Sequence, residues 1–188
     1  MSNVGEMTDT DSPVAAQRTP RDVAMRAMVA ATVELMLERS PDQITVREVA
    51  ARSGHHHRFV SAWFGGKAGL FRAAFDTMAT DISESLVLTA PPPGTVPTPA
   101  AVRLVHLMNW LATHDAEAFD VERPTPLIDR IAGQYTERFG QDPEEARLSA
   151  QRLLASVVAL TLFPGPFKVR PGDLDAHFAF EERVAATG

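Results

Sequence analysis

The side chains best suited to chemistry cluster in one short stretch of the sequence. Three consecutive histidines, His55, His56 and His57, are followed directly by Arg58, and Lys67 comes soon after. Imidazole, guanidinium and ammonium groups can all donate hydrogen bonds to phosphate oxygens or to the acceptor edges of bases. A guanidinium can also bind guanine O6 and N7 together, which makes Arg58 the best candidate for reading a base. The alternative is that Arg58 is an ordinary solvated arginine and that the histidines form an exposed polar turn.

The run of histidines does not predict a metal site. Neighbouring residues of a helix point about 100° apart, so three in a row do not converge on one ion as a pair spaced i, i+4 can. The chain of 188 residues has no cysteine, and no pair of acidic residues lies beside the histidines. We therefore expect neither a metal ligand nor another cofactor. The lack of cysteine also excludes a disulfide scaffold and a cysteine nucleophile.

Two short helices are expected to position these side chains. Thr45 and Glu48 form a capping box, because the Thr45 hydroxyl can accept a hydrogen bond from the Glu48 amide while the Glu48 carboxylate reaches back to Thr45. Gly54 provides the end of this first helix. A second short helix is expected from about His56 to Trp63.

The second helix is expected to turn Val60 and Phe64 inward and to end at Gly65 and Gly66, after which Lys67 begins a third helix. Two short helices around a tight, glycine-containing turn are typical of a helix-turn-helix, in which the second helix enters the major groove of DNA. At the start of a helix, Lys67 would add its charge to amides that already favour an anion such as phosphate. Plain surface charge is the alternative for Lys67.

This stretch resembles the DNA-binding domain of the tetracycline-repressor (TetR) family of transcriptional regulators. The matching segments read ELMLERS at 34–40, TVREVAARSG at 45–54, WF at 63–64 and GKAGL at 66–70. The resemblance covers roughly residues 22–72. It implies an all-α protein with an N-terminal three-helix helix-turn-helix domain and a C-terminal helical domain for dimerisation and ligand binding.

The departures from the family pattern fall in the recognition helix itself. His55 and His56 replace the usual Val-Ser, Ser61 replaces the usual Tyr, and Trp63 replaces the usual His or Tyr. In the family, the Tyr and the Lys at these positions commonly contact phosphates. Lys67 is retained, whereas Ser61 offers a shorter hydroxyl. The candidate DNA-contacting residues are Thr45, Arg47, His55, His56, His57, Arg58, Ser61, Trp63 and Lys67.

The charge of the chain is unevenly distributed. The whole sequence has a net charge of −6, which alone argues against a surface that attracts nucleic acid everywhere. Residues 21–75, however, carry a net +3, whereas residues 76–188 carry −7 and residues 1–20 carry −2. Attraction to phosphate is local, because the Debye length is only about 8–10 Å near physiological salt. The expected docking face is therefore positive.

The whole chain is predicted to be all-α and divided into three parts. Residues 1–20 form a polar, disordered tail, residues 21–75 form the helix-turn-helix domain, and residues 76–188 form an effector-binding and dimerisation domain. Proline-rich breaks separate the later helices, and the stretch 89–99 holds five prolines. No signal peptide and no apolar stretch of about 20 residues is present, so we expect a cytoplasmic protein without a membrane partner.

The C-terminal part is expected to bring two chains together. A helix over residues 143–163 becomes apolar on nearly all sides after Leu153, and a last amphipathic helix is expected near 173–186. A helix that is apolar all round must be covered on every side, which predicts a homodimer. By resemblance, an effector pocket lies between the C-terminal helices. Its candidate lining residues, for which plain core is the alternative, are Met78, Ile82, Met108, Trp110, Phe119, Tyr135 and Phe139.

The histidines of this part do not form a compact catalytic group, since His106 and His114 are two helical turns apart, and we expect no enzyme. The leading interpretation is a ligand-responsive transcriptional regulator, most simply a repressor. A small apolar effector would release it from a pseudo-palindromic operator in double-stranded DNA. The alternative is a ligand- or protein-binding helical dimer that has lost operator recognition.

Overall fold

The computed structural model describes residues 20–85, 98–115, 117–120 and 125–187 of the chain. Every regular element within these residues is helical, which confirms the predicted all-α fold. The predicted tail, residues 1–20, lies outside the described residues except for Pro20. The elements are α1 (Arg21–Glu38), a 3₁₀ turn η1 (Pro41–Gln43), α2 (Val46–Ser53), α3 (Arg58–Phe64), α4 (Lys67–Ser85), α5 (Pro99–His114), α6 (Pro126–Phe139), α7 (Pro143–Leu162) and α8 (Asp173–Thr187).

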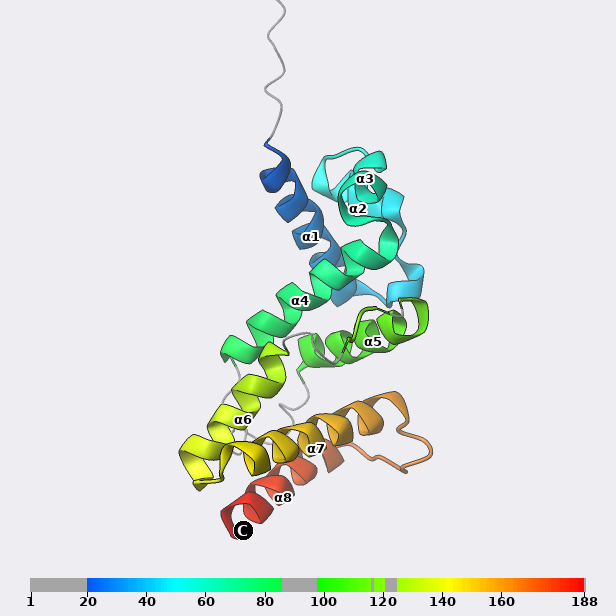
Figure 1. The fold of residues 1–188 in the computed structure, drawn as a ribbon. Coiled ribbons are helices and arrows are strands. Elements are labelled where there is room, and N and C mark those ends of the chain that lie inside the picture. The colour runs from blue at the N-terminus through cyan, green and yellow to red at the C-terminus, as the bar shows by residue number, and fades with distance from the viewer. Residues whose placement is uncertain (1–19, 86–97, 116, 121–124, 188) are drawn as a thin grey trace, which may run out of the picture.

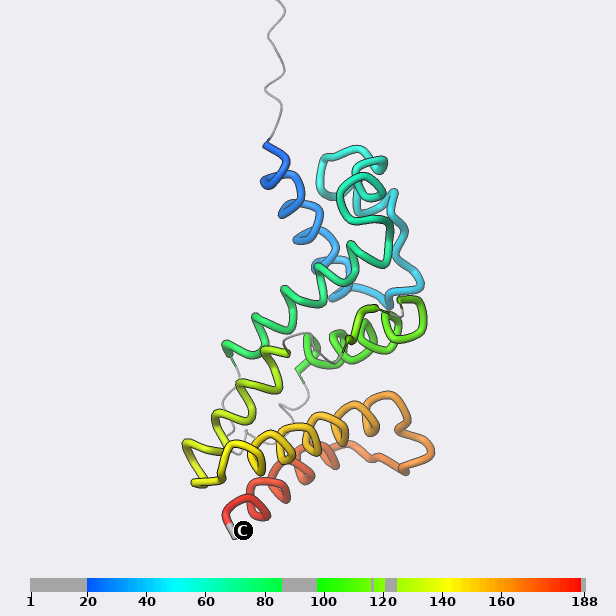
Figure 2. The backbone as a smooth tube through the Cα atoms, in the orientation of Figure 1, coloured from blue at the N-terminus to red at the C-terminus, as the bar shows by residue number. Residues whose placement is uncertain are grey.

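The helices form an elongated arrangement with a different group of helices at each end (Figure 1). Helices α1, α2 and α3 make one end, and α6, α7 and α8 make the other. Helix α4 runs from the first end toward the second and packs against α1, α3, α5 and α6. The tube drawing in Figure 2 shows that α7 and α8 lie side by side, far from α3. Helix α4 therefore connects the two ends of the molecule.

The capping box at the start of α2 is confirmed. The Thr45 Oγ1 accepts a hydrogen bond from the Glu48 amide at 3.3 Å, and the Glu48 carboxylate accepts one from the Thr45 amide at 2.9 Å. Helix α2 ends at Gly54, whose φ of 72° is left-handed and suits a residue without a side chain. Helix α7 is also capped at its N-terminus by a side chain. The Asp142 carboxylate accepts hydrogen bonds from the Glu144 and Glu145 amides at 2.9 and 3.1 Å.

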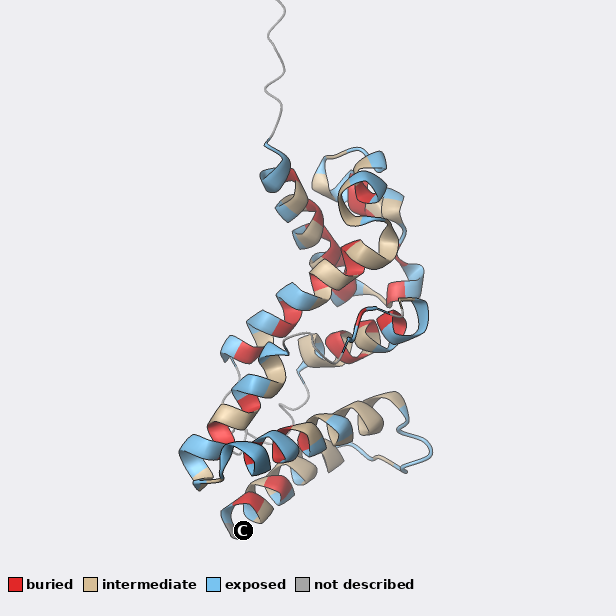
Figure 3. Cartoon of the chain, viewed as in Figure 1, coloured by how far each residue is buried: buried red, intermediate tan, exposed pale blue. Residues whose placement is uncertain are grey.

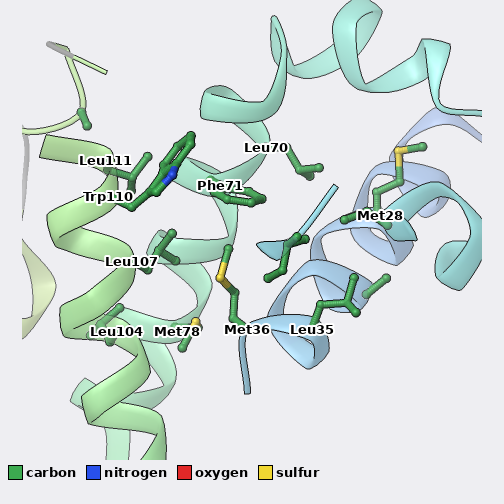
Figure 4. Close-up of a cluster of buried hydrophobic side chains, with 14 of the residues drawn as sticks. Met28, Leu35, Met36, Leu70, Phe71, Met78, Leu104, Leu107, Trp110 and Leu111 are labelled. Atoms are coloured by element: carbon green, nitrogen blue, oxygen red, sulfur yellow. The ribbon is translucent and has the colours of Figure 1, made fainter. Parts of the chain in front are cut away.

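The buried side chains form two clusters, visible as red bands in Figure 3. The first joins α1, α4 and α5 and includes Met28, Leu35, Phe71, Leu107 and Leu111, as the close-up in Figure 4 shows. The second, built by α6, α7 and α8, centres on Tyr135, Ile131, Ala150, Leu153 and Ala185. Residue 75, the predicted end of the helix-turn-helix domain, falls inside α4. The first cluster thus contains side chains from both sides of that predicted boundary.

The recognition helix begins two residues later than the sequence predicted. Helix α3 begins at Arg58, whereas the sequence predicted a start near His56. The reason is local: His56 stays in the turn, where its imidazole Nδ1 accepts a hydrogen bond from the Arg58 amide at 3.1 Å. Among the described residues, no helix combines the length and the apolar character that crossing a bilayer requires.

Candidate nucleic-acid interface

Helix α3 is held by its inner face and by the close approach of α4. Val60 has no solvent exposure, and it packs into the first buried cluster. The helix ends at Gly65, with a left-handed φ of 73°. Gly69, in the first turn of α4, lies so close to the carbonyl of Phe64 that a Cβ at this position would overlap the carbonyl oxygen. Glycine is therefore needed at position 69 for steric reasons, although its own backbone is helical.

The outer face of α2 and α3 carries most of the candidate DNA contacts. Six of the nine candidate side chains are exposed, namely Thr45, Arg47, His56, His57, Arg58 and Ser61. The remaining three, His55, Trp63 and Lys67, are half-buried. The two short helices lie next to each other at the end of the molecule farthest from α8 (Figure 1). Polar side chains that could reach a duplex are thus gathered on one end of the protein.

Two pairs of stacked rings lie on and just before the recognition helix, and three of their four residues were among the predicted DNA contacts. The rings of His56 and His57 stack with centroids 4.4 Å apart, and those of Phe59 and Trp63 stack at 4.2 Å with planes 3° apart. The guanidinium of Arg58 lies 5.1 Å from the centre of the Phe59 ring. Sequence reasoning missed Phe59, although its i, i+4 spacing from Trp63 indicates that the two rings meet on one face of a helix.

Arginines neutralise two of the acidic side chains near α2, Glu38 and Glu48, by ion pairing. Arg52 donates to the Glu38 carboxylate at 2.5 and 3.1 Å, and Arg39 donates to Glu48 at 2.8 Å. The hydrogen bond from Arg52 holds the pKa of Glu38 below its usual value. Hydrogen bonds from the Thr45 amide and hydroxyl, helped by Arg39, lower the pKa of Glu48. Both carboxylates therefore stay ionised and paired with an arginine.

Two arginines of the candidate face have no such acidic partner. Among the described residues, no ion pair involves Arg47 or Arg58, whereas Arg39 and Arg52 are both paired. Because Arg47 and Arg58 are also exposed, their full charge is available to an anion. At this end of the molecule, the unpaired positive charges of Arg47 and Arg58 therefore face solvent.

Lys67 lies at the start of α4, as predicted, but its side chain points elsewhere than expected. Its Nζ donates to the Pro41 carbonyl at 3.2 Å and lies 4.8 and 5.0 Å from the ring centres of Phe71 and Trp110. Burial lowers the pKa of Lys67, although the nearby Asp42 acts in the opposite direction. The ammonium is directed into the protein and not toward the outer face. This conformation differs from the predicted phosphate contact, because a carbonyl and two rings offer the ammonium closer partners.

A cavity of about 700 Å³ lies among α4, α5, α6 and α7. Its apolar wall includes Phe75, Leu104, Leu127, Leu154 and Val158, together with two of the predicted pocket residues, Met108 and Phe119. Polar side chains, among them Thr80, Asp129, Arg147 and Gln151, also border it. The cavity has the size and mixed lining of a small-molecule site.

The other five predicted pocket residues do not line this cavity. Met78 and Trp110 are buried in the first cluster, and Ile82 packs against it. Tyr135 is buried in the second cluster, and Phe139 packs against that cluster. Large apolar residues fill both cores, so residue type alone does not separate core from cavity wall.

Comparisons with known proteins agree with the helix-turn-helix and with the fold. The chain is 34% identical over 73 residues to an HTH-type transcriptional repressor of Mycobacterium tuberculosis and to an HTH-type transcriptional regulator of Mycobacterium bovis. Each alignment covers 39% of this chain and 39% of the relative, so the chain matches about two fifths of the length of these relatives. No protein-family model matches the chain.

Two solved structures share the overall fold. A TetR-family transcriptional regulator from Streptomyces coelicolor is 16% identical, with a TM-score of 0.52 over 89% of this chain and 84% of its own. The TetR-family repressor AlkX from Dietzia sp. strain DQ12-45-1b is 18% identical, with a TM-score of 0.51 over 89% of this chain and 94% of its own. Both are described as transcriptional regulators or repressors. The sequence resemblance is confirmed: the chain has the fold of the TetR-family transcriptional regulators.

Proposed function

We propose that the chain binds double-stranded DNA through α2 and α3 and acts as a transcriptional regulator, most simply a repressor. The observation that carries this proposal is the outer face of the helix-turn-helix, where exposed Arg47 and Arg58 lack acidic partners while the neighbouring acids are paired. Such a face attracts phosphates, and the second helix of the motif can enter a major groove. The fold shared with TetR-family regulators supports the same conclusion.

We also propose that two chains assemble through α7 and α8. Large apolar side chains are more than half exposed on or near these helices: Leu148, Phe163, Phe167 and Phe180. The second half of α7, which the sequence predicted to be covered on every side, is only half-buried in the single chain. A second copy related by a two-fold axis would cover these side chains and place two recognition helices on successive major grooves.

The cavity among α4, α5, α6 and α7 is the site we propose for a small effector. Its wall is mainly apolar, and it is bordered by α4, the helix that begins directly after α3. An effector can lower the affinity for DNA only if it binds the DNA-free arrangement more tightly than the DNA-bound arrangement. Because α4 both borders the cavity and follows α3, a ligand in the cavity could change the placement of α3.

The substitution Arg47→Ala tests the docking face. Each phosphate contact contributes about 0.9 to the slope of log affinity against log salt concentration. Removal of one contact from each chain should therefore lower the slope by about 0.9 for a single bound chain and by about 1.8 for the proposed dimer. The matched control is Arg52→Ala, because the Arg52 guanidinium is bound to Glu38 and its charge is already matched. Titration of a fluorescent 30-base-pair duplex between 50 and 200 mM salt measures both. Equal slopes for wild type and Arg47→Ala would place the docking face elsewhere.

The substitution Met108→Trp tests the cavity. Met108 lines it from α5, so the larger indole should fill the space and weaken binding of the neutral apolar dye Nile red by at least about tenfold. Val23→Trp adds the same ring at an exposed position on α1 and serves as the control. Unchanged dye affinity in Met108→Trp would show that the dye binds outside the cavity.

A ligand- or protein-binding dimer without operator recognition is the second candidate. The inward direction of Lys67 and the short hydroxyl of Ser61 favour it, because both positions would otherwise contribute phosphate contacts. This candidate predicts that dye binding persists while the affinity for DNA is weak and independent of sequence.

A further inference from the structure

The ammonium of Lys67, at the beginning of α4, contacts both η1 and α5. Lys67 is the first residue of α4 and follows α3 after only two glycines. Its Nζ donates to the carbonyl of Pro41 in η1 at 3.2 Å, and it lies 5.0 Å from the centre of the Trp110 ring of α5. Three elements that are distant in the sequence thus meet at a single side chain.

Trp110 is held firmly enough to act as a fixed partner for this ammonium. Its side chain is 8% exposed, its ring lies 4.8 Å from that of Phe71, and it stacks on the ring of His114 at 4.2 Å with planes 7° apart. Figure 4 shows Trp110 beside Phe71, between α5 and α4. A cation over the face of an indole is attracted by the ring electrons, and Trp is the strongest of the aromatic partners.

Helix α5 also borders the cavity. Leu104 and Met108, six and two residues before Trp110, contribute to the cavity wall. A second contact between the two helices, from Arg72 Nε to the Asp115 carboxylate at 2.9 Å, lies beyond the end of α5. The cavity wall and the Lys67 contact are therefore parts of one rigid helix, at a separation of a few residues.

We propose that Lys67 is a positioning residue, whose ammonium fastens α5 and η1 to the start of α4 and thereby sets the placement of the recognition helix. This inference rests on the proposed DNA-binding function. It assigns Lys67 a role that differs from the phosphate contact implied by the resemblance to the TetR family. It also gives the cavity a direct connection to α3, because a shift of α5 would move Trp110 and, with it, the ammonium at the beginning of α4.

The first test separates positioning from phosphate binding. Lys67→Met keeps the length of the side chain and removes its charge. We expect a loss of about 3–10-fold in affinity for a 30-base-pair duplex, with an unchanged salt slope, because a weakened cation–π contact disturbs position and releases no counterion. Arg47→Ala is the comparison, with a slope lowered by about 0.9 for each bound chain, or about 1.8 for the proposed dimer. A slope lowered by the same amount in Lys67→Met would overturn the proposal.

The second test asks whether Lys67 acts through Trp110. In a Trp110→Leu background, Lys67→Met should lower the affinity by at most half as large a factor as in wild type, since the Trp110 ring is gone and only the Pro41 carbonyl and the Phe71 ring remain as partners. Arg47→Ala should cost as much as in wild type. Trp110→Phe keeps a ring and should retain most of the effect of Lys67→Met, which also guards against a Leu variant that does not fold. Independent, additive losses of Lys67→Met in all backgrounds would overturn the proposal.

A third measurement uses no DNA and distinguishes failure of this inference from failure of the proposed function. In thermal unfolding followed by circular dichroism, the losses in melting temperature caused by Lys67→Met and Trp110→Leu should add up to more than the loss in the double variant, by at least about 2 °C. If wild type shows no salt-dependent binding to the duplex, the DNA-binding function is wrong, and a non-additive cycle still supports the Lys67–Trp110 contact. An additive cycle overturns that contact whatever the DNA result.

Discussion

Replacing Gly69 with alanine should disrupt the helix-turn-helix more than any other single methyl group. The new Cβ would overlap the carbonyl oxygen of Phe64, and both partners are backbone-fixed, so neither can turn away. Overpacking against a backbone that cannot move costs about 3 kcal/mol or more, which corresponds to a drop of roughly 6–12 °C in melting temperature for a chain of this size. Because the overlap lies between α3 and α4, binding to duplex DNA should also fall below detection.

Gly133 in α6 provides the matched control for this substitution. It is also a helical glycine, but a Cβ built on it meets nothing within 4 Å. Gly133→Ala should therefore raise stability by about 0.5–1 kcal/mol, because alanine loses less conformational freedom in a helix. Thermal unfolding of the two variants gives opposite signs if the account is right. A Gly69→Ala protein as stable as wild type would show that α4 does not approach α3 as described.

Replacing Phe180 with glutamate should separate the two chains of the proposed dimer. Phe180 lies on α8 and is 52% exposed in the single chain, as expected for a side chain that a second copy covers. Burial of a phenylalanine is worth about 1.5–3 kcal/mol, and a two-fold interface contains two of them. The dissociation constant of the dimer should then rise by about 10²–10⁴-fold. Affinity for a two-half-site duplex should fall by at least about 100-fold, since each half-site is then bound separately.

Sedimentation velocity at several concentrations measures this effect. Leu37→Glu is the control, because Leu37 is similarly exposed (48%) but lies on α1, far from α7 and α8. Wild type and Leu37→Glu should sediment with the mass of two chains, and Phe180→Glu with the mass of one. If Phe180→Glu remained a dimer, or if wild type were a monomer, the interface proposed for α7 and α8 would be incorrect.

Local signals in the sequence predicted the helix-turn-helix with good accuracy because they act within a few residues. The capping box of Thr45 and Glu48 and the left-handed Gly54 are where the sequence placed them. Helix α3 begins two residues later than predicted, because the imidazole of His56 accepts a hydrogen bond from the Arg58 amide. The composition of the sequence does not reveal this contact.

Tertiary contacts were predicted less well, since they depend on residues distant in the sequence. Tyr135 and Met108 are both apolar helical residues, yet Tyr135 belongs to the second core cluster and Met108 to the cavity wall. Only the packing of α6 against α7 separates them. The direction of Lys67 depends in the same way on Trp110, 43 positions later in the chain. The sequence correctly predicted that Lys67 begins a helix, but it did not predict which groups the ammonium contacts.

Selection of binding sites from random or genomic DNA with the full chain tests the central claim most directly. The account predicts enrichment of a two-fold symmetric sequence whose half-sites are centred about 34–36 Å apart, one turn of the double helix. In the same experiment, Arg58→Ala should relax one position in each half-site, because it removes the best candidate for reading a base. Recovery of DNA without any enriched sequence, or the same sequence from wild type and Arg58→Ala, would contradict recognition by α3.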